Sequence, residues 1–200
     1  MPYKPNDREY RAVTPFNVIS DDDTSLELRG TPIVFDTPTV ICVIDGVEYK
    51  EVIARGALDE CDMSDFILNR NHGENDSTVY ARTRNDSLQY QITDRGLEVV
   101  AHLDEEDERH KNLHRDVKKR RVDKMSFSFI TKECSYNKDT RTRTILKIKK
   151  LYDVSAVDFP AYNETSITTA RSFFSEENEK EMRALEERAL RERLIALTYC

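Results

Sequence analysis

The sequence lacks several features that would place it in a common class of protein. It contains no apolar run close to the roughly 18 to 20 residues that cross a bilayer, and its N-terminus, MPYKPNDREYRA, lacks the apolar core of a secretory signal. The four cysteines, Cys42, Cys61, Cys134 and Cys200, lie far apart and show no paired spacing. These absences argue against a membrane span, a zinc knuckle and a disulfide framework. We therefore expect a soluble, intracellular protein with reduced thiols.

Basic residues are too few for broad binding to nucleic acid. The chain has 31 Lys and Arg against 38 Asp and Glu, a net charge of −7. Affinity for a phosphate backbone depends largely on Lys and Arg side chains that displace counterions. Hydrophobic residues make up 38% of the 200 residues, enough to form a core, and the length suits one domain with an appendage. We expect neither a nucleic-acid nor a membrane partner.

Short β-branched runs separated by turn residues predict a mostly β protein. Asp45 and Gly46 stand between two such runs, which is a strong hairpin signal. The expected strands cover residues 31–35, 39–44, 47–53, 78–83, 87–92, 97–103 and 122–133, with one or two more within 141–158. Helices are expected at 56–62 and 104–119. This spacing favours an α+β protein, mostly β, built on a closed β-barrel with peripheral helices.

The composition divides the chain into three parts. Residues 1–25 are polar and predict a loose lead-in or a solvated first hairpin, and residues 26–171 form the barrel domain. Residues 172–200 carry seven Glu, no Gly and no Pro, and their apolar residues recur at intervals of three and four. This pattern predicts an amphipathic C-terminal helix, which either packs on its own domain or binds a partner. We hypothesise that it docks the protein onto another subunit or is trimmed.

Few side chains qualify for nucleophilic hydrolysis, which needs a hydroxyl or thiol, a base and a group that orients the base. The chain has four histidines: His72, His102, His110 and His114. His110 and His114 share a face of a predicted helix and could bind a metal, but exposed charges surround them, which favours a solvated surface. His102 alternates within a strand and is expected to be half-buried. His72 differs, because the loop between Asn71 and Gly73 presents it at a strand rim.

Two further segments carry candidate groups. In KMSFSF, Ser126 and Ser128 lie on the strand face opposite large apolar residues, although such serines commonly face solvent. In LYDVSAVDFPAY, Asp153 interrupts a sequence otherwise fit for a buried strand, where a carboxylate is costly unless it is paired. Asp153 could fix the tautomer of His72 and stabilise the imidazolium that forms when Ser126 loses its proton. Asp158 is the alternative carboxylate, on the opposite face of the strand.

Taken together, these segments resemble the prohead proteases of tailed bacteriophages, distant relatives of the herpesvirus assemblins. The resemblance runs from about residue 30 to 171 through the blocks GTPIVFD, EVIARGALDE, ILNRNHG, ITDRGLEVVAHL, KMSFSF and LYDVSAVDFPAY, with the Thr-rich stretch and Arg171 after them. The resemblance rests on the order of these blocks and on their spacing. His72 and Ser126 are 54 residues apart, and Ser126 and Asp153 are 27 residues apart.

The resemblance implies an assemblin-type β-barrel serine endopeptidase. It would act in the host bacterial cytoplasm, inside the assembling procapsid, on the scaffold protein or a scaffold-like extension of the major capsid protein, and on itself. The resemblance implies no metal or organic cofactor, and it leaves open whether the protein forms a homo-oligomer. Two other classes are kept as alternatives: a non-catalytic capsid-assembly or scaffold-binding barrel protein, and a nuclease centred on His72, which the negative charge opposes.

Carried over position by position, the resemblance makes His72 the base and Ser126 the nucleophile. The assemblin relatives have a second His as the third member, and Asp153 stands at the matching position here. Ser128 stands where relatives often carry Gly, which makes it the alternative nucleophile. For the oxyanion hole, the resemblance points to the backbone amides of two residues after Pro160, namely Ala161 and Tyr162.

Overall fold

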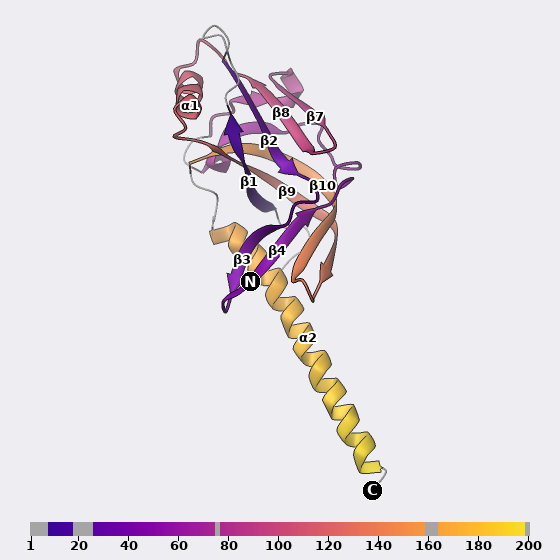
Figure 1. Ribbon diagram of the computed structural model, residues 1–200. Coiled ribbons are helices and arrows are strands. Elements are labelled where there is room, and N and C mark those ends of the chain that lie inside the picture. The colour runs from indigo at the N-terminus through magenta and orange to yellow at the C-terminus, as the bar shows by residue number, and fades with distance from the viewer. Residues whose placement is uncertain (1–7, 18–25, 75–76, 159–163, 199–200) are drawn as a thin grey trace.

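The structure is a computed structural model that describes residues 8–17, 26–74, 77–158 and 164–198 (Figure 1). Its strands are β1 (Glu9–Asn17), β2 (Glu27–Val34), β3 (Thr39–Ile44), β4 (Val47–Ile53), β5 (Ile67–Arg70), β6 (Ala81–Arg82), β7 (Leu88–Ile92), β8 (Gly96–His102), β9 (Lys124–Asn137) and β10 (Thr142–Val157). Its helices are the short 3-10 turns η1 (Asn71–Gly73) and η2 (Thr83–Asn85) and the α-helices α1 (Glu108–Lys118) and α2 (Glu164–Thr198). The predicted α+β class, mostly β, is confirmed.

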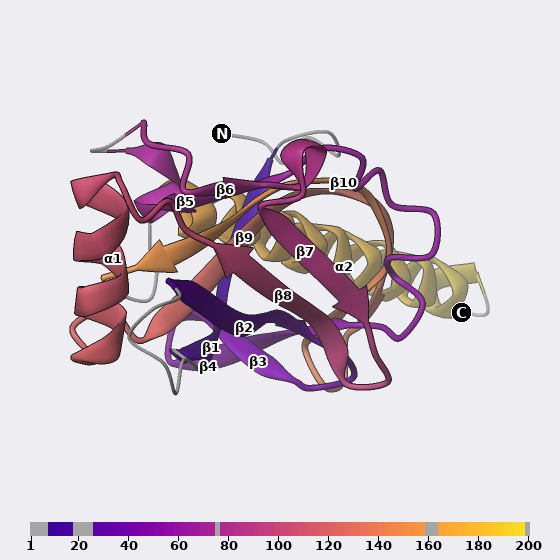
Figure 2. The same ribbon diagram turned by 90° about the horizontal axis from the view of Figure 1, so that it is seen from above.

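The strands form one sheet in the order β3-β4-β10-β9-β1-β2-β8-β7, with β5 and β6 branching from β10 (Figure 2). The prediction of a closed barrel is wrong, since no pairing among the described strands joins the two ends of this path. The reason is the length of β10, whose first half pairs with β4 and whose second half pairs with β5. The sheet therefore forks. The outer strand of the fork, β6, has two residues and pairs only with β5.

The long antiparallel pair of β9 and β10 forms the centre of the sheet. Along β9, Met125, Phe127 and Phe129 are fully buried and join the main apolar core. Burying such a side chain contributes roughly 1.5–3 kcal/mol. The intervening Ser126 and Ser128 lie on the opposite face, as the alternation predicts. Both are fully buried, so the expectation that such serines face solvent is not met.

Local signals succeeded in one loop and failed in another. The hairpin at Asp45 and Gly46 is confirmed, because both residues adopt the left-handed conformation, with φ of 50° and 79°, that this turn requires. The helix predicted at 56–62 is wrong, and the segment forms turns. Within the segment the backbone makes only turn bonds, such as Asp59 N to Gly56 O at 3.1 Å, and β10 takes two of its carbonyls: Ile148 N donates to Ala57 O at 2.8 Å, and Leu151 N donates to Asp62 O at 3.1 Å.

Helix α1 begins after Asp107, whose side chain caps it by accepting a hydrogen bond from Arg109 N at 2.8 Å. The expectation of a solvated surface for His110 and His114 is wrong, because each is only 7% exposed. Their face of the helix packs on the body, where His110 Nδ1 accepts from Asp104 N at 2.9 Å. Among the described residues, no group of three or more His, Cys, Asp or Glu could hold a metal ion.

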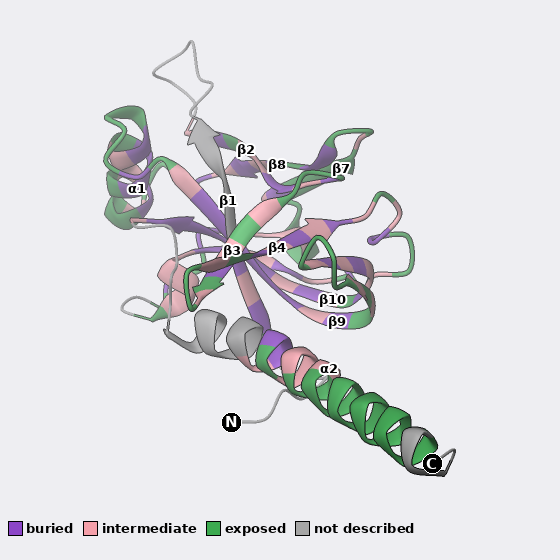
Figure 3. Cartoon of the chain, turned by 60° about the horizontal axis from the view of Figure 1, so that its bottom comes forward, coloured by how far each residue is buried: buried purple, intermediate pink, exposed green. Residues whose placement is uncertain are grey.

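Helix α2 confirms the predicted C-terminal helix and begins at Glu164, before residue 172. Phe173 and Phe174 pack on a small second core around Tyr49, and Arg143 lies 4.5 Å from the ring centroid of Phe173. Beyond these anchors the helix projects away from the sheet (Figures 1 and 3). Its apolar side chains there are more than half exposed; they are Met182, Leu185, Leu190, Leu194 and Ile195.

Two expectations about the environment can be compared with the described residues. No described helix is both long and apolar enough to span a membrane. The described cysteines, Cys42, Cys61 and Cys134, are free thiols. Burial raises the pKa of the Cys61 thiol to about 11, which keeps it protonated near neutral pH.

His102 is half-buried, as predicted, with Nδ1 3.2 Å from a carboxylate oxygen of Glu27.

The strand β1 is tied to the sheet by a buried ionic cluster. Its charged members are Glu9, Arg11, Glu51 and Arg143, none more than 6% exposed. Arg143 Nη1 donates to Glu9 Oε2 at 2.6 Å, and Arg11 Nε donates to Glu51 Oε1 at 2.5 Å. Burial acts to raise the pKa of Glu9, but the charges of Arg11 and Arg143 outweigh it and hold that pKa at about 2. The cluster therefore depends on an ionised Glu9.

We expect Glu9→Gln to lower the free energy of unfolding by roughly 3–5 kcal/mol at neutral pH, since it leaves buried cations uncompensated. The pKa of Glu9 is lowered by folding from 4.5 to about 2. Its contribution to stability is therefore complete above pH 4.5 and is lost as the pH falls toward about 2. Urea unfolding across this range should show a smaller acid-induced loss in the variant than in the wild type.

The control for this prediction is Glu48→Gln, which removes a carboxylate from the exposed pair with Lys50. Exposed pairs contribute about 0–1 kcal/mol, so this variant should stay close to the wild type. Equal losses in the two variants would contradict the role assigned to the buried cluster.

Candidate active site

Two neighbouring strands and one short turn bring the predicted site residues together. In the register of β9 with β10, Asp153 lies opposite Ser128 and Ser155 lies opposite Ser126. The strand β5 runs parallel along the other edge of β10 and leads directly into η1, which carries His72. Side chains opposite one another in a sheet share a face. Three segments that are distant in the sequence therefore meet at one place near α1 (Figure 2).

The three side chains predicted as nucleophile, base and orienting group lie in series. His72 Nε2 is 2.6 Å from Ser126 Oγ, and His72 Nδ1 is 2.7 Å from Asp153 Oδ1. Ser126 is fully buried, and the side chains of His72 and Asp153 are 3% and 1% exposed. Both distances are within hydrogen-bond reach, and the low exposure keeps competing water away from these bonds.

The ionisation of Asp153 decides the direction of these hydrogen bonds. Burial acts to raise its pKa, but the hydrogen bond and charge of His72, the hydroxyl of Ser128 and the charge of Arg8 outweigh it, and the pKa lies below its ordinary value. The carboxylate is therefore ionised at neutral pH and accepts from Nδ1–H. In the imidazole tautomer that carries its proton on Nδ1, His72 Nε2 can accept from the hydroxyl of Ser126.

The turn that carries His72 is strained and clamped. Asn71, His72 and Gly73 have φ of 47°, 56° and 79°, and left-handed backbone at non-glycine residues costs about 1–3 kcal/mol each. Asp158 clamps the first residue, because Asn71 Nδ2 donates to its carboxylate at 2.9 Å and Asp158 N donates to Asn71 Oδ1 at 3.1 Å. The alternative carboxylate of the sequence analysis thus holds the turn and does not contact the imidazole.

A second clamp was missed in the sequence. Ser155 Oγ accepts a hydrogen bond from His72 N at 3.0 Å and donates to the side-chain oxygen of Asn69. It also lies 3.2 Å from His72 Nδ1. Ser155 stands two positions after Asp153, so the alternation of the strand already placed it on the same face. The sequence gives no signal for Asn69 beyond its place directly after the apolar run of residues 66–68.

The alternative nucleophile, Ser128, has different partners from Ser126. Its hydroxyl donates to Asp153 Oδ2 and accepts from Arg8 Nε at 3.0 Å. Arg8 also donates to Asp153 Oδ2. Ser128 therefore contacts the carboxylate, whereas Ser126 contacts the imidazole. Arg8 was missed because it belongs to a polar stretch with no motif, and only the tertiary structure places it here.

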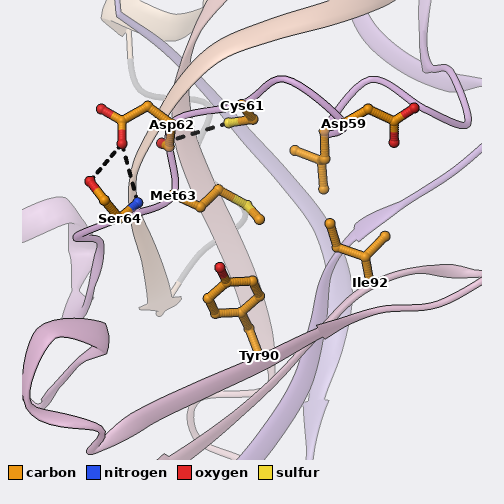
Figure 4. A pocket seen from close by; sticks show the side chains of 8 residues that line it. Asp59, Cys61, Asp62, Met63, Ser64, Tyr90 and Ile92 are labelled. Carbon is orange, nitrogen blue, oxygen red and sulfur yellow. Dashed lines mark hydrogen bonds between the residues drawn. The ribbon is translucent and has the colours of Figure 1, made fainter.

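Two other features lie outside this arrangement. The predicted oxyanion residues, Ala161 and Tyr162, fall outside the described residues. An open pocket of about 730 Å³ is lined by the segment before β5, including Asp62 and Met63, and by the edge strand β7, through Tyr90 and Ile92 (Figure 4). None of the three residues in series lines this pocket, so it is separate from the candidate site.

A hydroxyl, an imidazole and a carboxylate hydrogen-bonded in series have the geometry of a serine hydrolase. Comparison with known protein families agrees with this class: the profile of the caudovirus prohead serine proteases matches residues 14–180, most of the chain. The chain therefore belongs to the caudovirus prohead serine protease family, which confirms the resemblance to the prohead proteases of tailed bacteriophages. No curated protein and no solved structure matched the chain.

We expect Ser155→Ala to loosen the turn that carries His72. The variant leaves the His72 amide without its acceptor, and an unsatisfied buried donor costs roughly 1–3 kcal/mol. Urea unfolding should report that loss, and the His72 amide should exchange with deuterium faster than in the wild type. Ser155→Thr retains a hydroxyl and should restore slow exchange. Unchanged stability and exchange in Ser155→Ala would contradict the clamp.

Proposed function

We propose that the protein is a serine endopeptidase that matures the phage prohead from inside the procapsid, in the host bacterial cytoplasm. Its substrates are the scaffold protein or a scaffold-like extension of the major capsid protein, and the enzyme itself. Ser126 is the nucleophile, His72 the general base and Asp153 the orienting carboxylate. The observation that carries this proposal is the unbroken series of hydrogen bonds among these residues, within the part of the chain that matches the family.

The first half of the reaction forms an acyl-enzyme. As Ser126 Oγ attacks the carbonyl carbon of the scissile peptide bond, its proton moves to His72 Nε2. The ionised Asp153 stabilises the imidazolium through the hydrogen bond to Nδ1 and keeps the ring oriented. His72 then gives the proton to the leaving amine, the C–N bond breaks, and the carbonyl remains as an ester on Ser126.

The second half returns the enzyme to its starting state. Water loses a proton to His72 Nε2 and attacks the ester, and the carboxylic acid leaves as Ser126 regains its proton. Negative charge that develops on the carbonyl oxygen requires hydrogen-bond donors. The amides of Ala161 and Tyr162 remain the predicted donors for that position.

The hydrogen bonds favour Ser126 over Ser128 as the attacking residue. A nucleophilic hydroxyl needs a base that accepts its proton, and Ser126 Oγ lies 2.6 Å from Nε2 of His72, the ring nitrogen that faces away from the carboxylate. The hydroxyl of Ser128 donates to an ionised carboxylate with a lowered pKa, which is a weak base. Ser128 therefore supports Asp153.

Co-expression with the major capsid protein and its scaffold tests the proposed function. Wild type should yield truncated scaffold or capsid protein by intact mass, and Ser126→Ala should leave both at full length, because no acyl-enzyme forms. Ser135→Ala is the matched control, since Ser135 is an exposed serine on the same strand. Full-length products in all three cases would favour a non-catalytic assembly protein, and identical truncation in all three would refute the assigned nucleophile.

Covalent labelling distinguishes the two serines. We expect diisopropyl fluorophosphate to add one adduct to Ser128→Ala, at Ser126, and none to Ser126→Ala. Peptidase activity in Ser128→Ala should fall by no more than about 100-fold, the scale of a misplaced catalytic group. Peptide mapping by mass spectrometry locates the adduct. Labelling of Ser126→Ala at Ser128 would reverse the assignment.

A further inference from the structure

The end of α1 and the chain that follows it carry a strongly basic stretch in an acidic protein. Whereas the whole chain has a net charge of −7, this stretch has five cations and one carboxylate, that of Asp123. Four of the cations are exposed and the fifth is half-buried. We call them the basic rim; they are Lys118, Lys119, Arg120, Arg121 and Lys124.

The carboxylate of α1 that lies nearest to the basic rim is already engaged. Asp116 Oδ1 accepts from Arg121 Nη1 at 3.1 Å, and Asp116 Oδ2 accepts from Arg70 Nη1 at 3.3 Å. Arg70 directly precedes the turn that carries His72, so this carboxylate joins the rim to the candidate site. Three cations of the rim form no ion pair among the described residues, namely Lys119, Arg120 and Lys124.

The basic rim borders the candidate site at the start of β9, which lies beside α1 (Figure 2). Lys124 stands two positions before Ser126, so the alternation of the strand puts both on one face, with roughly 6–7 Å between their Cα atoms. In the ladder, Lys124 lies opposite Val157, and the next residue, Asp158, clamps the turn that carries His72. A peptide that extends from Ser126 toward the start of β9 therefore meets the rim.

The fold does not require the charge of Arg120. This residue follows the end of α1 with φ of 55°, in the left-handed region, and its amide donates to Val117 O at 2.9 Å. Glycine is the residue that suits this position at the end of a helix. A glycine would make the same backbone bond without a side chain. The cation at this position is therefore available for an interaction outside the fold.

Charge complementarity selects an acidic polypeptide as the partner of the basic rim. A short segment with several Asp or Glu can pair with the free cations and stay within the rim. A long polyanion would extend past it and meet the repulsion of a chain with a net charge of −7. This argument favours an acidic protein segment over a nucleic acid.

We propose that the basic rim binds an acidic segment of the protein substrate beside the scissile bond and thereby helps to select the cleavage site. The inference rests on the proposed function, because it requires Ser126 to be the nucleophile next to the rim. It adds a chemical class, acidic flanking residues, to a substrate that is otherwise defined only as scaffold or capsid protein.

The first test measures binding in the full-length Ser126→Ala chain, which does not cleave the probe. The probe is a fluorescein-labelled peptide of alternating Glu and Ser, followed by fluorescence anisotropy. Adding Lys119→Gln and Arg120→Gly should weaken binding about 3- to 10-fold, the loss expected for two exposed ion pairs. A peptide of alternating Gln and Ser should bind neither chain, and added salt should weaken binding of the acidic peptide.

The matched control repeats these substitutions at the opposite end of the hairpin formed by β9 and β10. Lys138→Gln and Arg141→Gly remove two exposed cations from the turn that joins these strands. Arg141 also has a left-handed backbone, with φ of 50°, so glycine suits both positions equally. The control should bind the acidic peptide as tightly as Ser126→Ala alone.

The second test measures cleavage with Ser126 present. The substrate is the scaffold or capsid segment that the wild type truncates in co-expression. Lys119→Gln with Arg120→Gly should raise KM about 3- to 10-fold and leave kcat unchanged, since the rim does not contact the reacting atoms. Diisopropyl fluorophosphate is uncharged and does not need the rim, so it should label Ser126 at the wild-type rate.

Unchanged peptide binding and KM in the rim variant, or an equal loss in the control, overturns the inference. Tighter binding of a single-stranded oligonucleotide than of the acidic peptide also overturns it, in favour of a nucleic-acid partner. Both results leave the proposed function standing, because the wild type still cleaves its substrate. Absence of cleavage by the wild type refutes the proposed function, and the selection of cleavage sites by the rim with it.

Discussion

The register between β9 and β10 is the constraint on which the candidate site depends. It places Asp153 opposite Ser128 and Ser155 opposite Ser126, so these four polar side chains lie on one face. A slip of one residue would turn these groups toward the core and expose Phe127 to the polar side. The burial of the aromatic face therefore fixes the register, and the register fixes the positions of the polar groups in the candidate site.

The neighbouring strands complete this arrangement from both sides. On one side, β5 pairs with the second half of β10 and delivers His72 through a left-handed turn that Ser155 and Asp158 clamp. On the other side, β1 pairs with β9, with Glu9 and Arg11 on one face of the strand and Tyr10 on the other. Its anchoring face lies in a buried ionic cluster, and its other face lies over the imidazole and the carboxylate. The buried anchor and the contacts with the candidate site thus come from the same segment of the chain.

Local patterns in the sequence were reliable where neighbouring residues decide the structure. The hairpin at Asp45 and Gly46 and the two-faced strand containing Ser126 follow from turn chemistry and alternation, and the structure confirms both. The helix predicted at 56–62 is wrong because backbone amides of β10 bind carbonyls of that segment, which leaves only turns within it. The expectation that His110 lies on a solvated surface is wrong because its face of α1 packs against the rest of the protein. The prediction of a closed barrel is wrong because β10 pairs with β4 along its first half and with β5 along its second half.

The sequence by itself determined the mostly β class, the C-terminal helix, the family and the identity of the three candidate residues. Each of these follows from patterns within short blocks of adjacent residues. Only the tertiary structure decided which groups surround them: the clamp by Ser155 and Asn69, the pairing of Ser128 with the carboxylate, and the approach of Arg8. These contacts join residues up to 145 positions apart. Strand register and strand order create them, and neither is encoded in any local stretch of the chain.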